Sequence, residues 1–167
     1  MGITPRFNSK DTLKTLQKGY LTIERGILAV MQRTGEEFAT DAKDNLKIDP
    51  SFHQGDYKDQ TGNLRSSIGY FVLKDGAIIS QKFSGNQEGI IEAVSVLGEI
   101  PNKQGYQLVG VAGMVYASSV ESKGYNVMSS QKEVALIDLN DRLRKFAERM
   151  NKKGVDVGFN LDDLAVS

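Results

Sequence analysis

An apolar stripe with a period near the heptad constrains the fold of this 167-residue chain more than any other feature. Between residue 9 and about residue 47, side chains of one helical face recur at steps of three and four positions. The series is Leu13, Leu16, Tyr20, Ile23, Ile27 and Val30, continued by Thr34, Phe38, Ala42 and Leu46. This spacing predicts one long amphipathic helix. It leaves open whether the helix only covers a sheet or also packs its second face on a neighbouring subunit.

Three glycines interrupt this predicted helix, at Gly19, Gly26 and Gly35. Each glycine costs about 1 kcal/mol of helix stability relative to alanine, so its presence needs a reason. The reasons that we consider are close packing against another element and a bend in the helix.

The middle of the chain changes from helical to strand chemistry. A turn-rich loop over residues 49–63 includes Thr61, which is expected to cap a short helical turn before the first strand. Asp75 and Gly76 form the preferred dipeptide for a type I′ hairpin turn between two apolar runs. The predicted strands are residues 69–73, 77–83, 106–112 and 125–128.

The second half of the chain predicts two short helices and a long one. Residues 86–101 follow a helical face, although their β-branched content also suits a strand, and we favour a short helix. Residues 114–122 predict another short helix, which ends before Gly124. A second long helix is expected over residues 130–152.

These elements predict an α+β fold. Ser130 and Glu133 have the spacing of a capping box at the start of the second long helix, and Gly154 closes its end. Residues 1–153 are expected to form one domain, with two long helices packed on one face of a small, mostly antiparallel sheet of three or four strands. Residues 154–167 alternate briefly between apolar and polar and end acidic, which predicts a flexible or partner-dependent tail.

Composition excludes several classes of protein. Lysine plus arginine equals aspartate plus glutamate at 21 each, which argues against a protein whose main partner is bare nucleic acid. The absence of cysteine rules out a disulfide framework and a thiolate zinc site. We find no apolar run of the roughly 20 residues that a membrane helix needs, and no signal-peptide pattern at the start. We therefore expect a protein made in a cytoplasm, with no membrane partner.

Residue types that could carry catalysis are present but lack supporting motifs. His53 is the only histidine, and Asp56 and Asp59 beside it could form only a weak hard-cation site, so a solvated loop histidine is favoured. Ser129 and Lys132 have the spacing of serine acyl enzymes, but the companion motifs of that class are missing. We expect no catalytic residue, no metal, no cofactor and no small-molecule substrate, and hence no enzyme. A hydrolase acting through Ser129 and Lys132 is kept as an alternative.

The second long helix has a basic C-terminal half. Its cations are Arg142, Arg144, Lys145, Arg149, Lys152 and Lys153. Cations near a helix C-terminus suit the helix dipole, and most such runs are solvated faces. The functional alternative is a nucleic-acid-binding module, with DNA phosphates contacted by Arg142, Lys145, Arg149 and Lys152.

Two short boxes, about fifty residues apart, stand out from the rest of the sequence. The first is an acidic loop with a hydroxyl and a glycine that runs directly into the first predicted strand. It reads Asp59-Gln60-Thr61-Gly62-Asn63-Leu64-Arg65-Ser66-Ser67-Ile68. The second is an aromatic-led helical turn that a glycine stops. It reads Tyr116-Ala117-Ser118-Ser119-Val120-Glu121-Ser122-Lys123-Gly124.

In this order the two boxes resemble the HK-ninety-seven gene-ten-like tail-component family, which comprises tail-completion or head–tail joining proteins of long-tailed phages. The family pattern is Asp-Thr-Gly-x-Leu-Arg followed by Tyr-Ala-x-x-Val-Glu-x-Gly. The positions that align are Asp59, Thr61, Gly62, Leu64, Arg65, Ile68, Tyr116, Ala117, Val120, Glu121 and Gly124. Gln60 is an extra residue, and Gly124 stands one place later than in the family. Arg65 and Glu121 could form a charge-assisted pair, within the chain or across a subunit boundary, or remain two independent surface charges.

The resemblance implies a non-enzymatic virion protein, either phage or prophage. Members of the family form a ring, typically sixfold, at the neck or tail top, so the implied partners are further copies of the chain and other neck or tail proteins. Residues 49–63 and 154–167 would then order on assembly. A minor capsid or tail terminator protein is the rival within the same class, and the nucleic-acid-binding module is the rival from another.

Overall fold

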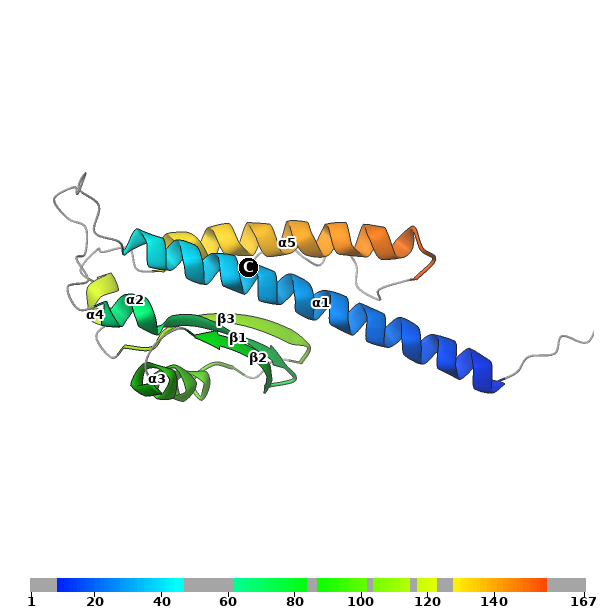
Figure 1. Ribbon diagram of the computed structural model, residues 1–167, viewed down its shortest axis with the longest axis horizontal. Helices are drawn as coiled ribbons and strands as arrows, with labels where there is room; N and C mark the ends of the chain where they lie inside the picture. The colour runs from blue at the N-terminus through cyan, green and yellow to red at the C-terminus, as the bar shows by residue number, and fades with distance from the viewer. Residues whose placement is uncertain are drawn as a thin grey trace, which may run out of the picture.

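A computed structural model describes residues 9–46, 62–83, 87–101, 104–114, 117–122 and 128–155. In chain order the elements are α1 (Ser9–Asn45), α2 (Asn63–Ser67), β1 (Ile68–Lys74), β2 (Ala77–Phe83), α3 (Gln87–Leu97), β3 (Tyr106–Ala112), α4 (Ala117–Ser122) and α5 (Ser129–Asn151). The two long helices lie side by side above a small sheet (Figure 1). The predicted α+β fold is confirmed.

The sheet has three strands in the order β2-β1-β3, and both pairings are antiparallel. The central strand β1 is apolar and buried along nearly its whole length. Asp75 and Gly76 adopt left-handed φ values of 51° and 80°, as the predicted type I′ turn between β1 and β2 requires. The predicted bounds of β2 and β3 are confirmed, because alternation and turn chemistry both mark them in the sequence.

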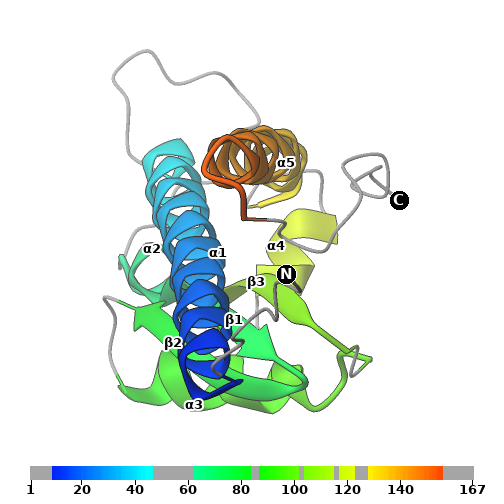
Figure 2. The same cartoon turned by 90° about the vertical axis from the view of Figure 1, so that its right-hand side faces the viewer.

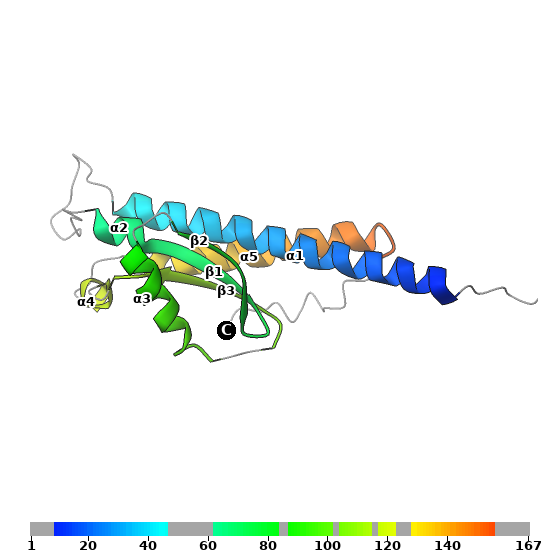
Figure 3. The ribbon, with the colours of Figure 1, turned by 60° about the horizontal axis from the view of Figure 1, so that its bottom comes forward.

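The two long helices lie on one face of the sheet, as predicted, and the short helix α3 covers the other face, which the prediction did not include. On one face, Tyr70 and Val72 of β1 pack with Met31 of α1. On the other face, Phe71 and Leu73 pack with Ala93 of α3. Figure 3 shows α3 in front of the sheet and α1 behind it. The reason is the continuous apolar run in β1, which buries alternate side chains on opposite faces.

The helices α1 and α5 are antiparallel neighbours, and a glycine allows their close approach (Figures 1 and 2). A Cβ atom on Gly26 would lie 2.2 Å from the ring of the buried Phe146 of α5. A Cβ atom on Gly35 would similarly lie 2.6 Å from the ring of Tyr70. Close packing therefore explains these two glycines, whereas a Cβ atom on Gly19 would meet nothing within 4 Å.

Two predicted helix caps are wrong. The first turn of α5 closes on Met128, whose C=O accepts the N–H of Lys132 at 3.0 Å, so Ser130 lies inside the helix and forms no capping box. The residue before α2 is Gly62, with a left-handed φ of 73° that glycine adopts without strain, instead of Thr61. Of the predicted strand 125–128, only Met128 is among the described residues, and residues 86–101 contain the helix α3, as favoured.

Candidate functional site

The two sequence boxes meet in the core, at the C-terminal end of α1. Leu64 and Ile68 of the first box are fully buried. They share one apolar cluster with Ala117 of the second box and with Phe38 and Ala42 of α1. This part of the resemblance therefore corresponds to packing that joins α2, α4 and α1.

The polar residues of the boxes are only partly described. Gly62 and Arg65 are exposed. Burial, followed by the positive charge of Arg65 and then that of Lys82, lowers the pKa of Lys43, so Arg65 lies in a basic neighbourhood. Asp59, Thr61, Tyr116 and Gly124 lie outside the described residues, as do the side chains of Val120 and Glu121. The predicted pair between Arg65 and Glu121 therefore stays a prediction.

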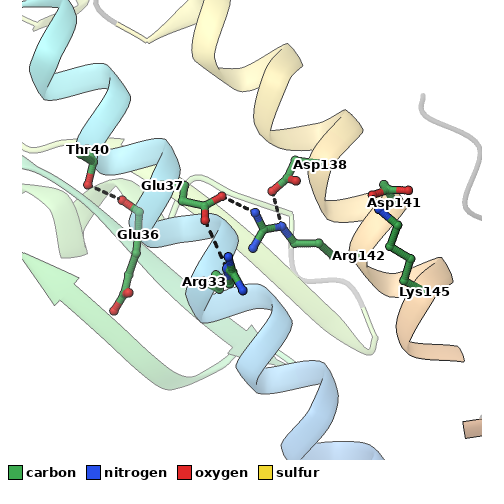
Figure 4. A network of polar contacts seen from close by, with 8 residues as sticks. All are labelled: Arg33, Glu36, Glu37, Thr40, Asp138, Asp141, Arg142 and Lys145. Carbon is green, nitrogen blue, oxygen red and sulfur yellow. Dashed lines mark hydrogen bonds and ion pairs between the residues drawn. The ribbon is translucent and has the colours of Figure 1, made fainter. Parts of the chain in front are cut away.

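A charged network joins α1 to α5 (Figure 4). Arg142 of α5 forms ion pairs with Glu37 of α1 and, at 2.5 Å, with Asp138 one turn earlier on α5. Arg33 Nε donates a hydrogen bond of 3.2 Å to the other carboxylate oxygen of Glu37. The close contact with the Asp138 carboxylate, followed by the charge of Glu37, raises the pKa of Arg142. Because the charge of Arg142 is already neutralised by two carboxylates of the fold, Arg142 is less available to bind a DNA phosphate.

The remaining predicted DNA contacts are exposed but interspersed with carboxylates. Lys145 forms an ion pair of 2.5 Å with Asp141, and Arg149 Nε donates to the C=O of Lys145 at 3.1 Å. Lys152 follows the helix and is exposed. Within α5, five lysines and arginines are interspersed with four acidic residues, so the helix does not present a uniformly basic face.

The N-terminal part of α1, residues 10–22, includes the end of the helix that projects beyond α5 and the sheet (Figure 1). We call it the α1 arm. Leu13, Leu16 and Tyr20, which continue the stripe of the buried half of the helix, are 59%, 65% and 57% exposed. Farther along the same stripe, Phe38 is buried. The C-terminal half of the stripe is therefore packed in the core, whereas its N-terminal part is exposed to solvent.

A polar cluster holds the base of the arm against the hairpin turn. Lys74 at the end of β1 forms an ion pair with Glu24 and donates a hydrogen bond of 3.2 Å to the Tyr20 hydroxyl. Its ammonium also lies 5.5 Å from the centre of the Tyr106 ring. The hydrogen bond from Lys74 lowers the pKa of Glu24, and the same bond raises the pKa of Lys74.

Sequence reasoning missed both interhelical and helix–sheet ion pairs. The partners Glu24 and Lys74 are 50 residues apart, and Glu37 and Arg142 are 105 residues apart. No local motif marks such pairs, because only the fold brings them together. Their roles are structural, since each links two elements of the described fold.

Within the described part of the chain, no group of three or more acidic or histidine side chains could hold a metal ion. His53 lies outside that part. Ser129 and Lys132 are exposed in the first turn of α5. Among the helices described, none is long and apolar enough to cross a membrane.

Comparisons of the chain with models of protein families, with curated proteins and with solved structures find no match.

Proposed function

We propose that this protein is a phage or prophage structural subunit that completes the tail or joins it to the head, and that it acts by assembly into a ring in the virion. The observation that carries the proposal is the exposed stripe of the α1 arm. The resemblance of the two boxes to the tail-component family supplies the class of assembly. Catalysis plays no part in this role.

The α1 arm has the properties of an interface element. Leu13, Leu16 and Tyr20 lie on one helical face at steps of three and four, as in helices that pack on another helix or in a groove. Fully burying a leucine side chain contributes about 1.5–3 kcal/mol, and the isolated chain forgoes more than half of this at Leu13 and at Leu16, which are 59% and 65% exposed. A head-to-tail contact between the arm of one copy and another surface of the next closes into a ring where the rotation permits.

The test is the mass of the purified protein in solution, measured by light scattering over a concentration series. A sixfold ring of this 18.4 kDa chain has a mass of about 110 kDa. We expect Leu16→Asp to shift the population toward the monomer, because a charge on the stripe cannot be buried without a large cost. Thr15→Asp is the matched control, since it adds the same charge to an exposed neighbouring position off the stripe.

Equal masses for the unmodified protein and Leu16→Asp at every concentration would refute the role of the arm. DNA titration at several salt concentrations tests the rival function. A steep fall of affinity with salt, lost on Arg149→Ala and Lys152→Ala, would instead favour the nucleic-acid-binding module.

A further inference from the structure

The strand β3 lies at an edge of the described sheet, and its unpaired backbone groups can be assigned. The register places Tyr70 opposite Gly110 and Phe71 opposite Val109. Beyond the two ends of the ladder, the N–H of Gly113 donates to the C=O of Ser67, and the N–H of Asp75 donates to the C=O of Gly105. Antiparallel pairs alternate in hydrogen bonding, so odd-numbered residues of β3 bond to β1. The even-numbered residues Leu108, Gly110 and Ala112 therefore direct their N–H and C=O groups to the outer edge.

A groove of about 700 Å³ runs along this outer edge, between β3 and the helices on both sides of the sheet. Its wall on the α5 side includes Leu136 and Leu139. Its wall on the α3 side includes Val96 and Ile100. An apolar groove beside unpaired strand backbone has the features of a strand-accepting site, in which ladder hydrogen bonds and side-chain burial act together.

The chain supplies a segment with the pattern of a strand immediately after α5. From residue 155 to residue 161 it alternates strictly, with Val155, Val157, Phe159 and Leu161 separated by Asp156, Gly158 and Asn160. Such alternation is typical of a strand with one buried face. We propose that residues 157–161 add to the outer edge of β3 of the same chain as a fourth strand, parallel to β3.

The end of α5 turns the chain toward this edge. Gly154 has a φ of 72°, the N–H of Val155 donates to the C=O of Met150, and the N–H of Gly154 donates to the C=O of Asn151. This Schellman arrangement ends the helix and reverses the chain. Because α5 runs opposite to β3, a strand that follows this reversal would run in the direction of β3. Three residues of extended chain, at about 3.3 Å each, cover the roughly 10 Å between a helix layer and a sheet layer.

The handedness of the resulting connection is the favoured one. In Figure 2 the strands follow in the order β2, β1, β3 from left to right, and β3 points away from the viewer toward α4. The helix α5 lies above the sheet on the β3 side, so a parallel strand added to the right of β3 completes a right-handed crossover. Charge also fits, because Asp162 and Asp163 would follow the strand toward Lys132, which lines the groove at the start of α5.

Amide hydrogen exchange measured residue by residue by NMR tests this strand. We expect the amides of Leu108 and Gly110 to exchange at least tenfold faster in a chain that stops at Val155 than in the full chain. The amides of Val109 and Val111, which bond to β1, should exchange at the same rate in both, and this also shows that the shortened chain is folded. Should it not fold, Phe159→Asp in the full chain gives the same test, with Asn160→Asp as the control on the polar face.

Loss of protection at Leu108 and Gly110 in the shortened chain or in Phe159→Asp, but not in Asn160→Asp, supports the strand. Equal exchange of these amides in the full chain and the disrupted chain overturns it. A labelled shortened chain mixed with the unlabelled full chain identifies the donor of the strand. Recovery of protection in that mixture would assign the strand to a second copy and overturn the intrachain arrangement. The exchange rates of Leu108 and Gly110 report on the added strand alone, so this test does not depend on whether the α1 arm builds a ring.

Discussion

The contact between Gly26 and Phe146 gives the sharpest test of how α1 and α5 are held together. Alanine at Gly26 would place its Cβ atom 2.2 Å from two atoms of the Phe146 ring and 3.2 Å from a third. Phe146 is 8% exposed and packed into the interface, so the ring cannot move aside freely. We expect Gly26→Ala to destabilise the fold, although the same change normally stabilises a helix.

The expected magnitude follows from two opposing terms. Replacing glycine by alanine inside a helix contributes about 1 kcal/mol of stability. Overpacking a filled core by one methyl group costs about 1–3 kcal/mol. Gly26→Ala should therefore lower the free energy of unfolding by up to about 2 kcal/mol. Gly19→Ala in the same helix is the matched control, because a Cβ atom there meets nothing within 4 Å and only the gain applies.

The assay is urea unfolding followed by circular dichroism, at concentrations where the protein is monomeric. The helix-propensity gain cancels between the two variants, so Gly26→Ala should be less stable than Gly19→Ala by about 1–3 kcal/mol. Phe146→Leu combined with Gly26→Ala should recover part of the loss, since the smaller side chain leaves room for the methyl group. If Gly26→Ala is as stable as Gly19→Ala, the close approach of the two helices is refuted.

Two further predictions concern buried and ionised groups. The Thr34 hydroxyl is buried and has no hydrogen-bond partner among the described residues, so Thr34→Val should raise the free energy of unfolding by about 1 kcal/mol. Thr22→Val, where the exposed hydroxyl bonds to the C=O of Lys18, should show no such gain in the same urea assay. The hydrogen bond from Lys74 lowers the pKa of Glu24 below its ordinary value of 4.5. The ionised carboxylate therefore stabilises the fold fully above pH 4.5, and this stabilisation is lost as the pH falls through the lowered pKa. Glu24→Gln should therefore be less stable than the unmodified protein at pH 7, and the difference should shrink toward pH 3. A difference that does not vary with pH would contradict the ion pair.

The sequence predicts elements better than it predicts the layers that they form. The hairpin around Asp75 and Gly76 is predictable because the turn type requires those residues, and alternation defines β3 without reference to the rest of the chain. The placement of α3 on the second face was missed, although the unbroken apolar run from Tyr70 to Leu73 indicated a strand buried on both faces. The ion pairs of Glu24 and Glu37 carry no local signal, because their partners are distant in the chain.

The length of α1 decides between the two interpretations of its stripe. A helix of 37 residues is about 55 Å long at 1.5 Å per residue. A strand of seven residues covers only about 23 Å at 3.3 Å per residue. The sheet can therefore bury less than half of the stripe. The helix α5 has 23 residues, or about 35 Å, and ends before the N-terminal end of α1 is reached (Figure 1). A helix that served only to cover this sheet would need no apolar face at Leu13 and Leu16, and that surplus is the part of the stripe that the assembly proposal puts to use.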